Sequence, residues 1–87
     1  MTREKFDAIE RSVDFYWEER AAVYKAIESS GLDAHGADGC AAARIAMAVV
    51  QREIQRRRDA AGVTPEELDE YEYLTECHNE MLRGGEA

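Results

Sequence analysis

The first 30 residues of the chain carry hydrophobic side chains at alternating intervals of three and four residues, the spacing of one face of an α-helix. Arg20 interrupts this series where another apolar residue is expected. We therefore predict one helix over residues 2–30, about 40 Å long. The rest of an 87-residue chain is too short to cover such a helix, which favours self-association. The series consists of Phe6, Ile9, Val13, Tyr16, Val23 and Ile27.

The same helix carries apolar side chains outside this series. Phe15 lies on the far side of the helix, in line with Ala8 and Ala22, whereas Trp17 and Tyr24 widen the main stripe. Two apolar surfaces on one helix need two sets of covering side chains, and aromatic residues are common anchors of protein interfaces. The expected interface residues are Phe6, Ile9, Val13, Phe15, Tyr16, Trp17, Arg20 and Tyr24.

A second helical pattern covers residues 38–61 and begins with a run of alanines that lets another helix approach closely. Its apolar stripe runs through Ala43, Met47, Val50 and Ile54. Asp38 is the expected N-cap. The glycines at positions 31, 36 and 39 predict that the polar loop over residues 31–37 is the most mobile segment.

A capping signature introduces a third helix over residues 65–83. Gly62 ends the second helix, and Thr64 can cap the third. Pro65 suits the first helical position, and Glu67 can return the capping-box hydrogen bond. The buried positions expected on this helix are Leu68, Tyr71, Leu74, Thr75, Cys77, His78 and Met81 or Leu82.

Short connections between helices favour antiparallel neighbours. The predicted fold is therefore all-α: a single domain over residues 1–87, with three helices in an up-down-up arrangement and a long first helix. A monomeric core of this size is only marginally stabilising, so we also expect an oligomer, most simply a homodimer.

The net charge of −8 is concentrated in the last third of the chain. Residues 1–30 sum to −2 and residues 31–62 to +1, whereas residues 63–87 contain one basic and eight acidic side chains and sum to −7. Such a chain repels phosphate backbones, which disfavours direct nucleic-acid binding and favours a protein partner with a basic surface. The expected partner-binding acidic face consists of Glu66, Glu67, Asp69, Glu70, Glu72, Glu76 and Glu80.

The basic residues of the second helix gather near its end, at Arg52, Arg56, Arg57 and Arg58. We expect the start of the third helix to neutralise this cluster, with Glu66, Glu67, Asp69 and Glu70 folding close by. An anionic partner is the alternative.

His35, Cys40, Cys77 and His78 are residue types that bind zinc. In an antiparallel pair, however, Cys40 lies roughly 12 Å along the axis from the level of Cys77, which is too far for one metal ion or a disulfide. We therefore expect no metal site and no cofactor. The first residues lead directly into a polar helix start without a signal peptide, so we also expect reduced thiols and a cytoplasmic protein. The longest apolar run, residues 40–50, contains Arg44 and is too short to cross a membrane.

Arg20 has two interpretations. A buried guanidinium needs carboxylates, carbonyl groups or a ligand. In one interpretation its stem packs while its head reaches Glu19, another acidic residue or a second copy of the chain. In the other, Arg20 binds an anion inside a helical pocket.

A resemblance to a known family supports the interpretation that Arg20 binds an anion. The first helix resembles that of the all-α chorismate mutases at Arg3, Phe6-Asp7, Ile9-Glu10, Val13, Tyr16-Trp17 and Arg20, and residues 62–66 resemble that family's entry into its third helix. The resemblance implies a small, three-helical, dimeric enzyme with Arg3 and Arg20 as anion ligands. The chain departs from the family at Gly31 and at residues 39–43, where a lysine, an arginine and an acidic residue are expected.

Taken from the residues themselves, the sequence favours a small acidic protein-protein interaction or regulatory module that acts by binding. An adaptor, an antitoxin and a phage-type inhibitor of a basic nucleic-acid-binding protein all fit this description. Its expected partners are a second copy of itself and another protein. The alternative is a small all-α enzyme that resembles chorismate mutase.

Overall fold

The computed structural model describes residues 1–84, and in this part of the chain all regular structure is helical. Helix α1 spans Arg3–Ser29, α2 spans Ala37–Ala60 and α3 spans Pro65–Gly84. The all-α class is therefore confirmed. Each helix begins and ends within one residue of its expected range.

Local chemistry explains most of these helix ends. The Thr2 hydroxyl caps α1 by accepting a hydrogen bond from the Lys5 backbone N–H at 3.2 Å. The chain leaves α1 and α2 through Gly31 and Gly62, which have φ angles of 91° and 74°. Because a Cβ atom strains the backbone in this left-handed region and glycine has none, glycine suits both positions.

The start of α2 differs from the expectation. Its N-cap is Gly36, which makes no side-chain capping bond, and Asp38 lies inside the first turn. Gly39 belongs to the helix, not to the loop, and the loop buries it. A Cβ atom at this position would overlap the Asp33 carbonyl oxygen. Close approach of the loop to the helix therefore explains this glycine.

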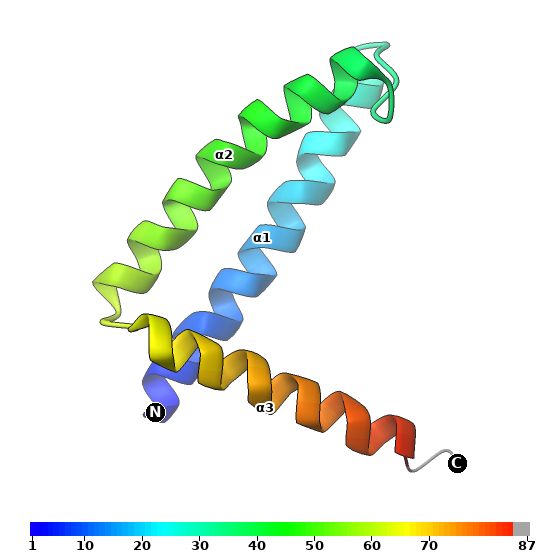
Figure 1. Cartoon of the computed structure of the whole chain (residues 1–87). Helices are drawn as coiled ribbons and strands as arrows, with labels where there is room; N and C mark the ends of the chain where they lie inside the picture. Colours follow the sequence, from blue (N-terminus) through cyan, green and yellow to red (C-terminus); the bar gives the residue numbers. More distant parts are fainter. Residues whose placement is uncertain (85–87) are drawn as a thin grey trace.

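Helices α1 and α2 form an antiparallel hairpin, with their long axes side by side over most of their length (Figure 1). The core of the hairpin is a single row of small and aliphatic side chains between the two helices. At the closed end, the loop residue Ala34 joins this core beside Ile27 and Ala43. The buried side chains of the hairpin are Ile9, Ser12, Ile27, Ala34, Ala43, Val50 and Ile54.

Helix α3 does not return along the hairpin. It crosses α1 near the N-terminus and then points away, so that its far end lies well outside the hairpin (Figure 1). The expected up-down-up arrangement is therefore not confirmed, since only its first two helices are antiparallel neighbours. The physical reason is that Tyr71 packs on Phe6 in the first turn of α1, with ring centroids 5.1 Å apart, and so sets α3 across the hairpin.

The resulting molecule is flat and open. Its principal extents are 43 × 40 × 16 Å and its radius of gyration is 16.2 Å, whereas a compact chain of this length has a radius of gyration of about 12 Å. It exposes 6510 Å² of surface, against about 5,200 Å² for a typical monomer of its mass. Among the described residues, no helix is long and apolar enough to span a membrane.

Candidate interaction surface

One side of α1 carries a continuous line of aromatic side chains around Arg20. We call Tyr16, Trp17, Arg20 and Tyr24 the aromatic strip. The Arg20 guanidinium carbon lies 4.6 Å from the Tyr24 ring centroid and 5.6 Å from that of Trp17. The Trp17 ring in turn meets Tyr16 edge-on, with centroids 5.2 Å apart. Arg20 is thus held by stacking on rings, and no ion pair with Glu19 forms among the described residues.

The strip borders a shallow groove between α1 and α2, which we call the hairpin groove. The groove has a volume of about 270 Å³, and Trp17 at its edge is 57 % exposed. Its α2 wall contains Gln51 and Arg58, which follow the helical spacing of Ile54. Gln51 was not singled out in the sequence, and Arg58 was noted there only as part of the basic cluster. The groove is lined by Val13, Tyr16, Trp17, Gln51, Ile54 and Arg58.

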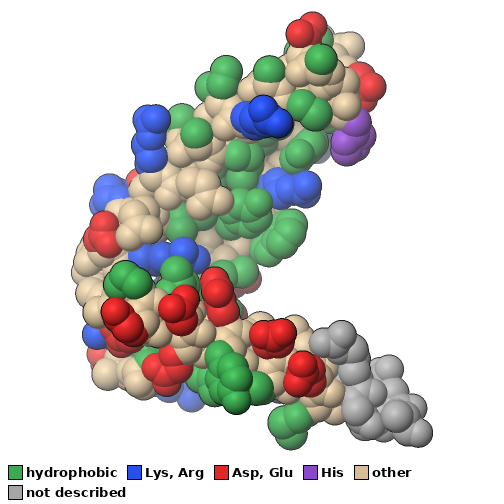
Figure 2. Space-filling model, viewed as in Figure 1, with side chains coloured by type: hydrophobic (Ala, Val, Ile, Leu, Met, Phe, Trp, Pro, Cys, Tyr) green, Lys and Arg blue, Asp and Glu red, His purple; other side chains and the backbone are tan. Residues whose placement is uncertain are grey.

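The groove faces the side of the hairpin from which α3 departs. Phe6, Val13, Trp17 and Tyr24 share one side of α1 by their spacing, and Phe6 is one of the residues that contact α3. Figure 2 shows hydrophobic side chains gathered in this inner angle, with acidic side chains over α3 and basic side chains over the hairpin. Apolar surface and opposite charges therefore meet at one concave side of the molecule.

The other predicted interface residues have internal partners. Ile9 is fully buried in the hairpin core and leaves no surface for a second protein. Phe15 is covered by the Arg57 guanidinium, whose carbon lies 4.0 Å from the ring centroid. Phe6 is stacked on Tyr71. The accessible part of the predicted interface is therefore the aromatic strip, with Val13 beside it.

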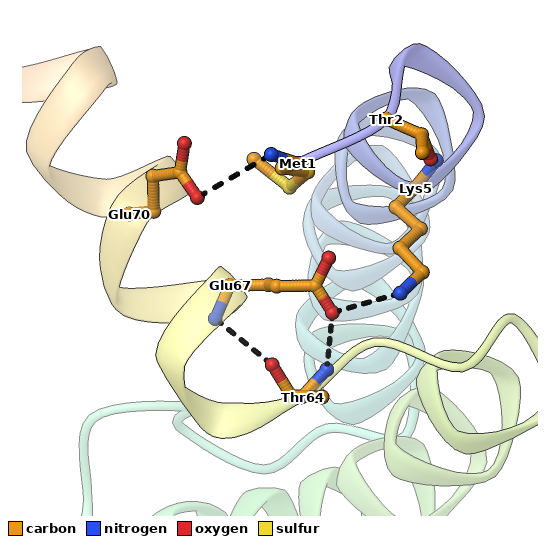
Figure 3. Close-up of polar contacts among 6 residues, drawn as sticks. All are labelled: Met1, Thr2, Lys5, Thr64, Glu67 and Glu70. Carbon is orange, nitrogen blue, oxygen red and sulfur yellow. Dashed lines mark hydrogen bonds and ion pairs between the residues drawn. The ribbon is translucent and has the colours of Figure 1, made fainter.

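A junction of polar groups fixes the start of α3 against α1 (Figure 3). Lys5 Nζ lies 3.0 Å from Glu67 Oε1, which also accepts the Thr64 backbone N–H at 3.1 Å. The Glu67 N–H donates to Thr64 Oγ1 at 3.2 Å, which completes the predicted capping box. These contacts, with Lys5 first and the Thr64 N–H second, lower the pKa of Glu67.

The junction divides the predicted acidic face of α3. Glu67 belongs to the junction, and Glu70 faces the N-terminal amino group, 3.7 Å away, as Figure 3 shows. The remaining acidic residues are exposed to solvent and available to a partner. They are Glu66, Asp69, Glu72, Glu76 and Glu80.

Beyond Tyr71, the side of α3 that continues from this residue is largely exposed, although Leu74 and His78 lie beside Phe6 of α1. We call Leu74, His78, Met81 and Leu82 the α3 stripe, and their spacing places them on one side of the helix. Leu74 is 45 % exposed and Met81 is 76 % exposed. The predicted burial of these positions therefore does not occur in the isolated chain.

Three arginines of the α2 cluster have partners within the hairpin, and a single carboxylate, Glu53, serves two of them. Glu53 accepts hydrogen bonds from Arg56 at 2.7 Å and from Arg57 at 3.0 Å, and these bonds lower its pKa to about 2. Arg58 Nε donates to the buried Ser12 hydroxyl at 3.0 Å. The expectation that acidic residues of α3 neutralise this cluster is wrong, because α3 leads away from α2.

The described part of the chain brings together neither a metal site nor an anion site that contains both Arg3 and Arg20. No group of three or more potential ligands could hold a metal ion there, and both cysteines are free thiols. Arg3 and Arg20 lie on the same helix about 25 Å apart. The Arg3 side chain is in solvent beside Asp7, so the two arginines do not converge within one chain.

Comparison with known proteins gives no match: no family model fits the chain, and no curated protein or solved structure is significantly similar to it. What the protein does must therefore follow from its own surfaces.

Proposed function

We propose that this protein is a small helical interaction or regulatory module that acts by binding, and that its basic unit is a homodimer formed through the aromatic strip. One observation carries the proposal. The chain exposes 6510 Å², about 1,300 Å² more than a typical monomer of its mass. A standard interface buries about 800 Å² per partner, so the surplus is large enough for a stable dimer.

The composition of the aromatic strip supports its role as the contact. Trp, Tyr and Arg are the residues that most often dominate binding energy at interfaces. Here the Arg20 guanidinium is already held over the Tyr24 ring, so little side-chain freedom remains to be lost on binding. Its N–H donors remain available to acceptors on a second molecule.

A second partner would use the exposed acidic residues of α3. These side chains stand on a helix whose start contacts α1 through the Lys5–Glu67 ion pair. A protein with a basic surface, such as a nucleic-acid-binding protein, is complementary to them. An adaptor, an antitoxin or an inhibitor would act in this way, by occupying that basic surface.

Solution mass tests the homodimer. Light scattering and sedimentation over a dilution series should give a dimer for the native chain and a monomer for Trp17→Ala at the same concentrations. Ile45→Ala is the matched control, because Ile45 is 72 % exposed on the outer side of α2. A native chain that remains monomeric at every concentration would overturn the homodimer.

Binding to immobilised oligolysine tests the acidic face. A Glu72→Gln/Glu76→Gln double variant should bind more weakly than the equally charged control Glu18→Gln/Glu28→Gln on α1, and binding should weaken steeply with added salt. Equal loss in the two double variants would mean that net charge alone is responsible, which would contradict a localised face.

A further inference from the structure

We propose that a pocket on the hairpin binds a phosphate group, supplied as free phosphate or by a small phosphate ester. The pocket, which we call the arginine pocket, lies between the first half of α1 and the end of α2 and has a volume of about 400 Å³. Small-ligand sites have volumes of about 300–1,000 Å³. The pocket is lined by Ala8, Arg11, Ser12, Arg56, Arg57, Ala60 and Ala61. By helical spacing Ala8 lies on the side of α1 opposite Trp17, so the site does not depend on the proposed homodimer.

The arginine pocket has an excess of positive charge. Among the described residues, its lining contains three arginines and no acidic side chain. Glu53, outside the lining, bonds to both Arg56 and Arg57, so that one carboxylate faces three guanidinium groups and two positive charges are left over. Asp59, the next acidic residue along α2, is bonded to Gln55 instead. A phosphate monoester carries a charge of about −1.5 to −2 at pH 7, which matches this excess.

Other charges near the pocket do not remove this excess. Asp7 and Asp14 lie about one turn from Arg11 along α1, and neither forms an ion pair with it in the described part of the chain. Asp7 lies 3.9 Å from Arg3 instead. The C-terminal end of α2 carries a partial negative charge of about half an elementary charge, which is smaller than the excess of two. The Arg11 guanidinium therefore remains available to an anion.

Two of the three guanidinium groups are held in place without a ligand. Arg56 donates to both carboxylate oxygens of Glu53, at 2.7 and 2.9 Å. Arg57 donates to the same carboxylate at 3.0 Å, and its guanidinium carbon lies 4.0 Å from the Phe15 ring centroid. A guanidinium has five N–H donors, so both arginines keep donors for an oxyanion. Because their side chains are already ordered, binding costs less conformational entropy.

The rest of the lining favours a small ligand that the arginines alone recognise. Besides the arginines it consists of three alanines and Ser12. The Ser12 hydroxyl donates to the Ile9 carbonyl oxygen at 2.6 Å and accepts from Arg58 at 3.0 Å, so it is already bonded within the protein. The whole chain has a net charge of −8, so an extended polyanion such as nucleic acid would meet repulsion outside the pocket.

Titration with inorganic phosphate and with glycerol phosphate at constant ionic strength tests the site. Calorimetry gives the dissociation constants, and NMR of the arginine Nε–H groups reports which side chains respond. We expect saturable binding with a dissociation constant below about 1 mM for at least one of the two ligands. The Nε–H signals of Arg11, Arg56 and Arg57 should shift, and that of Arg44 should not. Glycerol, which lacks the phosphate group, should not bind.

Arg11→Gln is the matching variant, because this exposed side chain holds no ion pair in the described part of the chain and its loss should leave the fold intact. Loss of its charge-assisted hydrogen bonds should raise the phosphate dissociation constant at least about 10-fold. The control is Arg44→Gln, which removes the same charge from an exposed position of α2 about 18 Å along the helix from Arg56. It should bind phosphate like the native chain.

The outcomes decide both the site and the source of the phosphate group. Tighter binding of glycerol phosphate than of inorganic phosphate would support a small ester as the ligand, and equal affinities would support recognition of the phosphate group alone. Equal weakening in Arg11→Gln and Arg44→Gln would mean that net charge is responsible, which overturns the site. Absence of saturable binding by both phosphate compounds, or shifts confined to arginines outside the pocket, also overturns it.

Discussion

Replacement of Arg20 by alanine separates the internal role of this side chain from its proposed role in binding. Arginine and alanine have nearly equal helix propensities, so the substitution removes little besides the stack. The guanidinium carbon lies 4.6 and 5.6 Å from the Tyr24 and Trp17 ring centroids. A half-exposed stack of this kind contributes about 0.5–1 kcal/mol. We expect the unfolding free energy of Arg20→Ala to fall by about 1 kcal/mol and Tm by about 4–8 °C.

The effect on association should be much larger. Loss of an arginine that dominates an interface costs about 2 kcal/mol or more of binding free energy, which would raise the dissociation constant about 30-fold. Thermal unfolding, monitored by circular dichroism below the dissociation constant, gives the first quantity, and sedimentation equilibrium gives the second. Arg52→Ala, an exposed arginine elsewhere on α2, should change neither by more than about 0.5 kcal/mol. A lower Tm with an unchanged dissociation constant would refute the assignment of Arg20 to the interface.

Three further predictions concern the fold and its pH dependence. Gly39→Ala should destabilise the chain by about 1–3 kcal/mol, because the new Cβ overlaps the Asp33 carbonyl oxygen. In an open helix the same change stabilises by about 1 kcal/mol. A Tm at or above the native value would show that the loop moves aside to make room for the Cβ. Thr64→Ala should lower the stability of α3 by about 1 kcal/mol, because it removes the capping hydroxyl. Thr64→Ser should keep this hydroxyl and the native stability, and circular dichroism measures the helicity of both variants. The pKa of Glu53 falls from 4.5 to about 2 in the folded chain through its bonds with Arg56 and Arg57, so its contribution to stability is complete above about pH 4.5 and is lost as the pH falls toward 2. Glu53→Gln should therefore flatten the acid side of the curve of Tm against pH, and equal slopes in the two proteins would contradict this origin.

Helix positions could be predicted because helix ends depend on chemistry within a few residues. The capping box of Thr64 and Glu67 is present as its spacing indicated, with both hydrogen bonds formed. Gly31 and Gly62 end their helices in the left-handed conformation. Asp38 was not the cap of α2, because the helix already begins at Ala37 after Gly36, and the loop approaches it so closely that only a glycine fits at position 39. That approach joins residues several positions apart and has no signature in the local pattern.

The direction of α3 could not be predicted for a different reason. Periodicity shows which side chains share a face, but it does not show which apolar surface that face will meet. The spacing of Tyr71 does not show which apolar surface it meets, and the Lys5–Glu67 pair joins residues 62 positions apart in the chain. The same limit applies to Arg20, which the spacing placed in an apolar seam and which lies on aromatic rings at the edge of the groove.

The thickness of the molecule, 16 Å along its shortest axis, affects more than its shape. A helix with its side chains is about 10–12 Å across, so the described backbone of a separate chain lies close to solvent. Local opening would then require little work, and the separate chain would be a ready substrate for proteases. With dimerisation as proposed, intact protein would accumulate only where synthesis keeps the chain above its dissociation constant. Its cellular level would then rise more steeply than its rate of synthesis, so that a small change in expression could switch the binding activity on or off.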